Sequence, residues 1–138
     1  MASHDKTVAP DLAAIPPLME WIEQRCQEAG LASELTFKLM LAIEEAATNV
    51  VSYAFAEVPP PHRFRVRLDI DDKRCAAELA DNGRPFDPSA APPPNLTAAL
   101  EEREAGGLGI HLLRNMADRI EYRREGGENR LRIETARR

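Results

Sequence analysis

Two polar residues, Glu45 and Asn49, interrupt the apolar stretch LAIEEAATNVVSYAF at residues 41–55. Consecutive residues of an α-helix differ by about 100° around its axis, so side chains four positions apart lie one above the other. Glu45 and Asn49 therefore form a polar pair at the edge of the apolar stripe, whereas Glu44 points away from it. A carboxylate and an amide oxygen suit Mg²⁺, with phosphates completing its shell. On this helix alone, a surface pair without function explains them equally well.

A second candidate is the segment DNGRPFD at residues 81–87, which follows a predicted strand. Asn82 and Gly83 form a common turn pair, so a tight turn is enough to explain them. Asp81 stands at the end of the strand, where a carboxylate can meet a ligand that lies over the sheet. Because a carboxylate only accepts hydrogen bonds, it could select a purine with an exocyclic amine, which is adenine.

The third candidate is GGLGI at residues 106–110, directly before a predicted helix. Glycines let the backbone approach a ligand closely, and a helix start offers free N–H groups to a phosphate. The segment is neither the GxGxxG of a dinucleotide fold nor a P-loop, since no GK[ST] follows it. Alone it is a weak signal, because flexible hinges and helix starts also use glycine.

Apolar periodicity predicts the elements that must position these residues. Spacings of three and four predict helices at about 16–29 and 33–55, with Ser33 as a cap. Period-two alternation and turn signals predict four strands, and the order of elements predicts an α+β fold: a two-layer sandwich in which one mixed, mostly antiparallel sheet is covered on one face by helices. The expected strands and remaining elements are 64–70, 74–80, 119–124, 129–135, a short helix at 111–118, and an arm or edge strand within 1–10.

Length and composition narrow the class of protein. The 138 residues suit one domain over 1–138, with residues 84–105, rich in Pro and Ala, as a long loop of the kind that often forms a lid. A net charge of −5 argues against a general nucleic-acid binder. The sequence shows no apolar run long enough to span a membrane, and its N-terminus lacks the basic segment followed by an apolar segment that is typical of a signal peptide. We therefore expect a cytoplasmic protein without direct nucleic-acid or membrane partners.

Together, and in this order, EAATN, DNGRPFD and GGLGI resemble the ATP-binding fold shared by gyrase B, histidine kinases and MutL. Within that superfamily, the chain is most similar over about residues 11–138 to the anti-sigma-factor serine/threonine kinases of the RsbW and SpoIIAB type. The helix carries Glu-x-x-x-Asn, the first glycine box has the form D-x-G-x-P-F-D-P, and GGENRLRIE looks like the family's ending. We also expect no phosphoacceptor histidine domain.

This resemblance implies a role for each candidate residue. Glu45 would be the general base that takes the proton from an attacking hydroxyl, and Asn49 would bind Mg²⁺ together with the ATP phosphates. Asp81 would accept a hydrogen bond from the adenine amine, with Gly83 leaving room for the ring. The phosphates would be cradled by Gly107, Leu108, Gly109 and Ile110.

Three further implications concern the edges of the site. Residues 84–105 would be the ATP lid. Asn129 stands near a position where many relatives have a threonine beside the adenine. Tyr53 stands where some relatives have a histidine, and no catalytic role follows for it.

The function implied by the resemblance is that of a protein-serine/threonine kinase that uses Mg-ATP. Its substrate would be an anti-sigma-factor antagonist, and the same or an overlapping surface would hold a sigma factor; relatives imply a homodimer. Phosphorylation would add about −2 charge and break the contact with the antagonist. The alternative is an ATP-binding switch module that captures a partner with little or no phosphotransfer. The presence of Glu45 favours the kinase.

Overall fold

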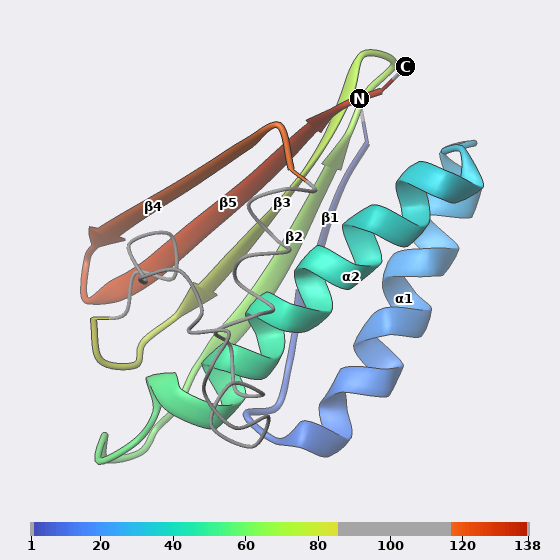
Figure 1. The fold of residues 1–138 in the computed structure, drawn as a ribbon. Coiled ribbons are helices and arrows are strands. Elements are labelled where there is room, and N and C mark those ends of the chain that lie inside the picture. Colours follow the sequence, from blue (N-terminus) through green and yellow to red (C-terminus); the bar gives the residue numbers. More distant parts are fainter. Residues whose placement is uncertain (1, 86–116, 138) are drawn as a thin grey trace, which may run out of the picture.

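The computed structural model describes residues 2–85 and 117–137, in which two α-helices cover one face of a five-stranded sheet (Figure 1). The strand order is β1-β2-β3-β5-β4, and each described neighbour pair is antiparallel. The predicted α+β sandwich is confirmed, with antiparallel pairing throughout the described sheet. Its strands are β1 (Ala2–Thr7), β2 (Phe64–Ile70), β3 (Arg74–Asp81), β4 (Arg119–Glu125) and β5 (Glu128–Ala136).

The first helical segment consists of the short 3₁₀ helix η1 (Leu12–Ala14) and the helix α1 (Ile15–Glu28). Two prolines stand in the first turn of α1, where a missing N–H costs nothing. Gly30 follows the helix with φ of 69°, a conformation that glycine adopts without steric cost. The predicted stop of this helix is therefore confirmed.

The second helix, α2 (Ser33–Asn49), continues as the π-helix η2 (Val50–Ala54), which matches the predicted helical range. The proposed cap is wrong. Ser33 is the first helical residue, and the cap position belongs to Ala32, which makes no side-chain hydrogen bond there. The first turn thus relies on the backbone alone.

The core lies between the two helices and the inner face of the sheet. Residues of α2 three and four positions apart, among them Leu39, Ile43 and Ala46, are buried against alternate residues of β2 and β3. Both cysteines are buried and free; burial, with a smaller effect of Cys26, raises the pKa of Cys75 to about 12. Within the described residues, neither helix has the length and apolar character that a membrane span requires.

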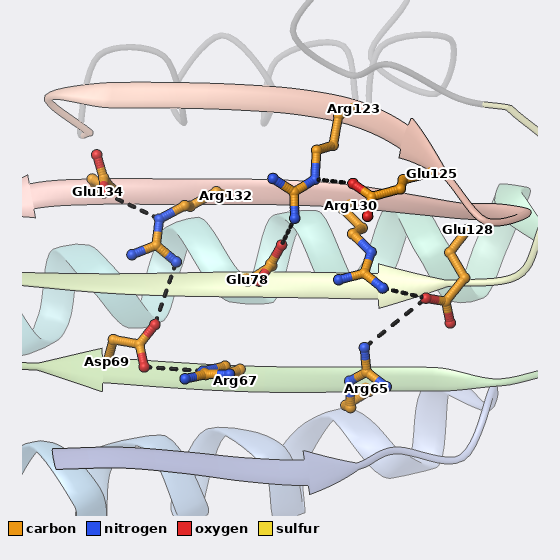
Figure 2. A network of polar contacts seen from close by, with 10 residues as sticks. All are labelled: Arg65, Arg67, Asp69, Glu78, Arg123, Glu125, Glu128, Arg130, Arg132 and Glu134. Carbon is orange, nitrogen blue, oxygen red and sulfur yellow. Dashed lines mark hydrogen bonds and ion pairs between the residues drawn. The ribbon is translucent and has the colours of Figure 1, made fainter.

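The face of the sheet away from the helices, here called the outer face, carries alternating basic and acidic side chains (Figure 2). Asp69 of β2 accepts hydrogen bonds from Ser3, Arg67 and Arg132, at 2.6, 3.0 and 3.3 Å. These bonds link β1, β2 and β5 through the carboxylate of Asp69. The outer-face residues drawn in Figure 2 are Arg65, Arg67, Asp69, Glu78, Arg123, Glu125, Glu128, Arg130, Arg132 and Glu134.

Several predicted features lie outside the described residues. These are GGLGI at 106–110, nearly all of the expected lid at 84–105 and most of the expected helix at 111–118. Ala117 and Asp118, the two described positions of that range, are not helical.

Candidate functional site

A small pocket forms between the end of α2, η2, the end of β3 and the β4–β5 hairpin. Figure 1 shows these elements. Sequence segments that are far apart, the EAATN helix and the DNG turn, thus meet at one place. The lining residues are Ala46, Asn49, Val50, Ala54, Leu79, Asp81, Tyr122, Asn129 and Leu131. Most of this lining is apolar, with a few polar groups that converge, as in sites for small molecules.

Asn49 lies in this pocket with only 2% of its surface exposed. Its side-chain nitrogen has no hydrogen-bond partner within the described part of the chain. Leaving such a buried group unsatisfied costs about 1–3 kcal/mol. This amide nitrogen is therefore a candidate for contact with a ligand in the pocket.

The two adjacent acids of α2 differ as the helical phase predicts. Glu44 is exposed, and Glu45 is half-buried one turn before Asn49. Burial raises the pKa of Glu45, and the charge of Glu44 adds to the effect. A carboxylate with a raised pKa binds a proton more readily, which suits a general base.

Asp81 is the last residue of β3 and is 3% exposed. Its Oδ1 accepts hydrogen bonds from the backbone N–H of Gly83 and from Asn129 Nδ2, both at 2.9 Å. Burial raises the pKa of Asp81, and these two hydrogen bonds offset part of that rise. A buried carboxylate that faces a pocket can select a ligand by its N–H donors.

Gly83 has a packing requirement of its own. A Cβ at this position would lie 2.3 Å from the carbonyl oxygen of Ala54. The next residue, Arg84, donates its backbone N–H to that same oxygen at 2.8 Å. Glycine is therefore required for the turn to dock on the end of η2, and the room it leaves for a ring stays a prediction.

Asn129 joins the site because β3 and β5 pair with Asp81 directly opposite Asn129. Sequence reasoning placed Asn129 here but missed Tyr122 and Arg124, which reach the same amide from β4. The two-residue turn Gly126–Gly127 sets the register that puts Arg124 opposite Asn129. That turn was the available signal. The expected phosphate residues Gly107, Leu108, Gly109 and Ile110 lie outside the described residues.

The domain is thus a sheet covered on one face by helices, with a small pocket between an Asn-bearing helix and an Asp-bearing strand end. The model of the histidine kinase-like ATPase domain matches residues 8–135, and the chain belongs to this family.

Curated relatives narrow the class within this family. The serine/threonine-protein kinase BtrW of Bordetella bronchiseptica is 32% identical over 115 residues, which cover 82% of this chain and 79% of BtrW. The serine-protein kinases RsbW of Bacillus cereus and Bacillus anthracis are each 27% identical over 124 residues, covering 82% of this chain and 76% of theirs. These relatives confirm the RsbW-type resemblance and the enzyme class, a serine/threonine-protein kinase.

A solved structure shares the fold. The crystal structure of the RsbU and RsbW domains of a Mycobacterium tuberculosis protein matches with a TM-score of 0.69 at 12% identity. The match covers 98% of this chain and 32% of that longer chain.

Proposed function

We propose that the chain is an ATP- and Mg²⁺-dependent protein-serine/threonine kinase that phosphorylates an anti-sigma-factor antagonist. In this proposal it also binds a sigma factor and works as a cytoplasmic homodimer. The chain forms a single domain over residues 1–138, with an N-terminal arm at 1–10 and an ATP lid at 84–105. The names of its kinase relatives support the class of reaction. The observation that carries the proposal is Asn49, which lines the same pocket as Asp81 and whose buried side-chain nitrogen has no hydrogen-bond partner among the described residues.

Each residue of the site has a defined task in this proposal. Mg-ATP supplies the phosphoryl group when it is bound. Asp81 would accept a hydrogen bond from the adenine amine. Asn49 would offer its amide oxygen to Mg²⁺ and would bind the ATP phosphates together with the metal. Glu45 takes the proton from the Ser or Thr hydroxyl of the antagonist, helped by its raised pKa. The phosphate cradle is assigned to Gly107, Leu108, Gly109 and Ile110.

Asn49→Leu tests the carrying observation. The change keeps the size of the side chain and replaces an amide whose buried nitrogen has no partner among the described residues by an apolar group, so the free protein should unfold at an equal or higher temperature. Mg-ATP should raise the unfolding temperature of the wild type and leave that of the variant unchanged. Equal protection of both proteins by Mg-ATP would contradict the role of Asn49.

Phosphotransfer is tested with labelled ATP and an antagonist protein recovered as a bound partner of the wild-type chain. The kinase should move the label to a Ser or Thr of that protein. Binding of ATP and partner without transfer would favour the alternative, a switch module. A chain that binds no ATP would contradict both.

A further inference from the structure

We infer that Asn129, Tyr122 and Arg124 are positioning residues: Asn129 and Tyr122 line the pocket, but all three act on the nucleotide by orienting Asp81. This inference rests on the proposed function and concerns how the adenine side of that site is built. Asn129 is 4% exposed and faces Asp81 across β3 and β5. Tyr122 and Arg124 reach it from β4, the edge strand beside β5.

Arg124 fixes which way the Asn129 amide points. A guanidinium can only donate hydrogen bonds, and Arg124 Nη1 lies 3.1 Å from Asn129 Oδ1. The Tyr122 hydroxyl donates to the same oxygen at 2.6 Å. Because two donors face the amide oxygen, the amide nitrogen must point the other way, toward Asp81.

The side chain of Asn129 has no hydrogen-bonding capacity left for a ligand. Its nitrogen donates to Asp81 Oδ1 at 2.9 Å and to the backbone oxygen of Arg84 at 2.7 Å. Its oxygen already accepts from Tyr122 and Arg124. Two donated and two accepted hydrogen bonds are the full set that an amide can make. Asn129 therefore has no hydrogen bond to offer adenine and influences the recognition of its amine through Asp81.

The effect on Asp81 is to separate its two oxygens. Asn129 and the backbone N–H of Gly83 both donate to Oδ1, so among the hydrogen bonds of the described residues Oδ2 remains the acceptor for a 6-amino group. Arg124 also donates to the Gly83 carbonyl oxygen at 2.7 Å. One guanidinium thus holds both the amide and the turn that orient the carboxylate before a nucleotide binds.

The test compares ATP with purine riboside triphosphate, which lacks the 6-amino group. Binding with Mg²⁺ is measured by titration calorimetry for the wild type, Asn129→Ala and Tyr122→Phe. Each variant should bind ATP about two- to ten-fold more weakly, as expected for one lost hydrogen bond, and should bind the analogue as the wild type does. Equal losses for both nucleotides would mean direct contact with the ring or a general effect on the fold, and would overturn the inference.

A double variant tests whether Tyr122 acts through Asn129. In the Asn129→Ala background, Tyr122→Phe should cause no further loss of ATP affinity, because the hydroxyl no longer has an amide to hold. If the two substitutions reduced ATP affinity additively, Tyr122 would not act through Asn129.

A matched pair on β4 tests Arg124. Arg124→Gln should weaken ATP and spare the analogue, whereas Arg123→Gln, on the other side of the same strand, should change neither. Equal ATP affinities for the Arg124→Gln and wild-type proteins would overturn the role of Arg124. A wild-type chain that binds no ATP would overturn the proposed function and this inference together. A wild-type chain that binds ATP, beside a Tyr122→Phe variant that binds it equally well, would overturn the inference alone.

Discussion

Two acids of the candidate site, Glu45 and Asp81, have raised pKa values, and burial is the main cause for both. A raised pKa means that folding makes the ionised carboxylate less favourable than it is in the unfolded chain. Perturbed pKa values cluster at functional sites, which makes both acids candidates for a function. In the proposed function, Glu45 would use its raised pKa for proton transfer, and Asp81 would use its carboxylate to recognise an N–H donor.

Glu45→Ala should separate binding from chemistry. A general base contributes about 10²–10⁴-fold to a rate, so the variant should bind Mg-ATP normally and transfer phosphate more slowly by a factor in that range. Glu44→Ala is the matched control, because Glu44 is the exposed neighbour on another side of α2. Single-turnover transfer to the antagonist measures both. If Glu44→Ala transferred phosphate slowly and Glu45→Ala at the wild-type rate, Glu44 and not Glu45 would be the general base.

Asp81→Asn should lose ATP and keep the fold. Its amide oxygen can still accept from Gly83 and Asn129, but its NH₂ group would face the adenine amine, so affinity should fall about ten-fold or more. Because the folded pKa of Asp81 is raised, the cost of its charge is present above that pKa and disappears as pH falls. The free variant should therefore be at least as stable as the wild type at pH 7. Calorimetry and thermal unfolding measure these effects, and loss of stability with unchanged affinity would contradict both expectations.

How much of the site could be predicted depends on the range of the interaction. The roles of Glu44 and Glu45 relative to the core follow from the helical repeat, which is a local property. The meeting of Asn49 with Asp81 needed the resemblance, since no local rule brings the end of a helix to the end of a strand. The four hydrogen bonds of Asn129 could not be foreseen, because they depend on the register of β3, β4 and β5 together.

At the scale of elements, the outer face of the sheet is stabilised by charge pairing rather than by apolar packing (Figure 2). Arg132 bridges Asp69 of β2 and Glu134 of β5, and Arg123 bridges Glu78 of β3 and Glu125 of β4. Burial alone would raise the pKa of Asp69, but its hydrogen bonds from Ser3, Arg67 and Arg132 outweigh burial and lower it.

Asp69→Asn should therefore destabilise the protein in a pH-dependent way. A lowered folded pKa gives stability that is present above the unfolded pKa of about 4 and is lost as pH falls through the folded pKa. The variant should be less stable than the wild type by about 1 kcal/mol at pH 7, and the difference should shrink below about pH 4. Urea unfolding across pH measures it, with Asp72→Asn, exposed in the β2–β3 turn, as control. A difference that grows in acid would contradict the assignment.

The elements themselves were predictable where the pattern was long. The strand 64–70 alternates clearly and the strand 74–80 follows it after a turn, and both predictions differ from the observed bounds by at most one residue. Ser33 failed as a cap because the chain is already helical at that residue. The change from α-helix to the π-helix η2 could not be predicted. The carbonyl oxygen of Ala54 in η2 contacts the turn at Gly83 and accepts the backbone N–H of Arg84, and both residues are distant in sequence.

At the scale of the whole molecule, Arg137 connects the end of the chain to both layers. Its Nη2 donates to the carbonyl oxygen of Ala29, after α1, at 2.8 Å, and its Nη1 donates to the carbonyl oxygen of Asp71, in the β2–β3 turn, at 2.9 Å. Its backbone N–H binds the carbonyl oxygen of Lys73. One side chain thus holds the helical layer against the sheet beside the β2–β3 turn, at the end of the sheet opposite the β4–β5 turn (Figure 1).

Arg137→Ala should lower the stability of the whole domain without touching the site. Two charged hydrogen bonds to partly buried carbonyls are lost, and these carbonyls can regain water, so the free energy of unfolding should fall by about 1–3 kcal/mol. Arg123→Ala, an exposed arginine of β4, should change it by about 0.5 kcal/mol or less. Urea unfolding gives both values, and titration with ATP shows whether the pocket is intact. Because the hydrogen bonds of Arg137 join the two layers far from the pocket, the folded Arg137→Ala protein should bind ATP with wild-type affinity. A variant of wild-type stability, or one that loses ATP affinity while fully folded, would show that Arg137 does not act as a clamp between the layers.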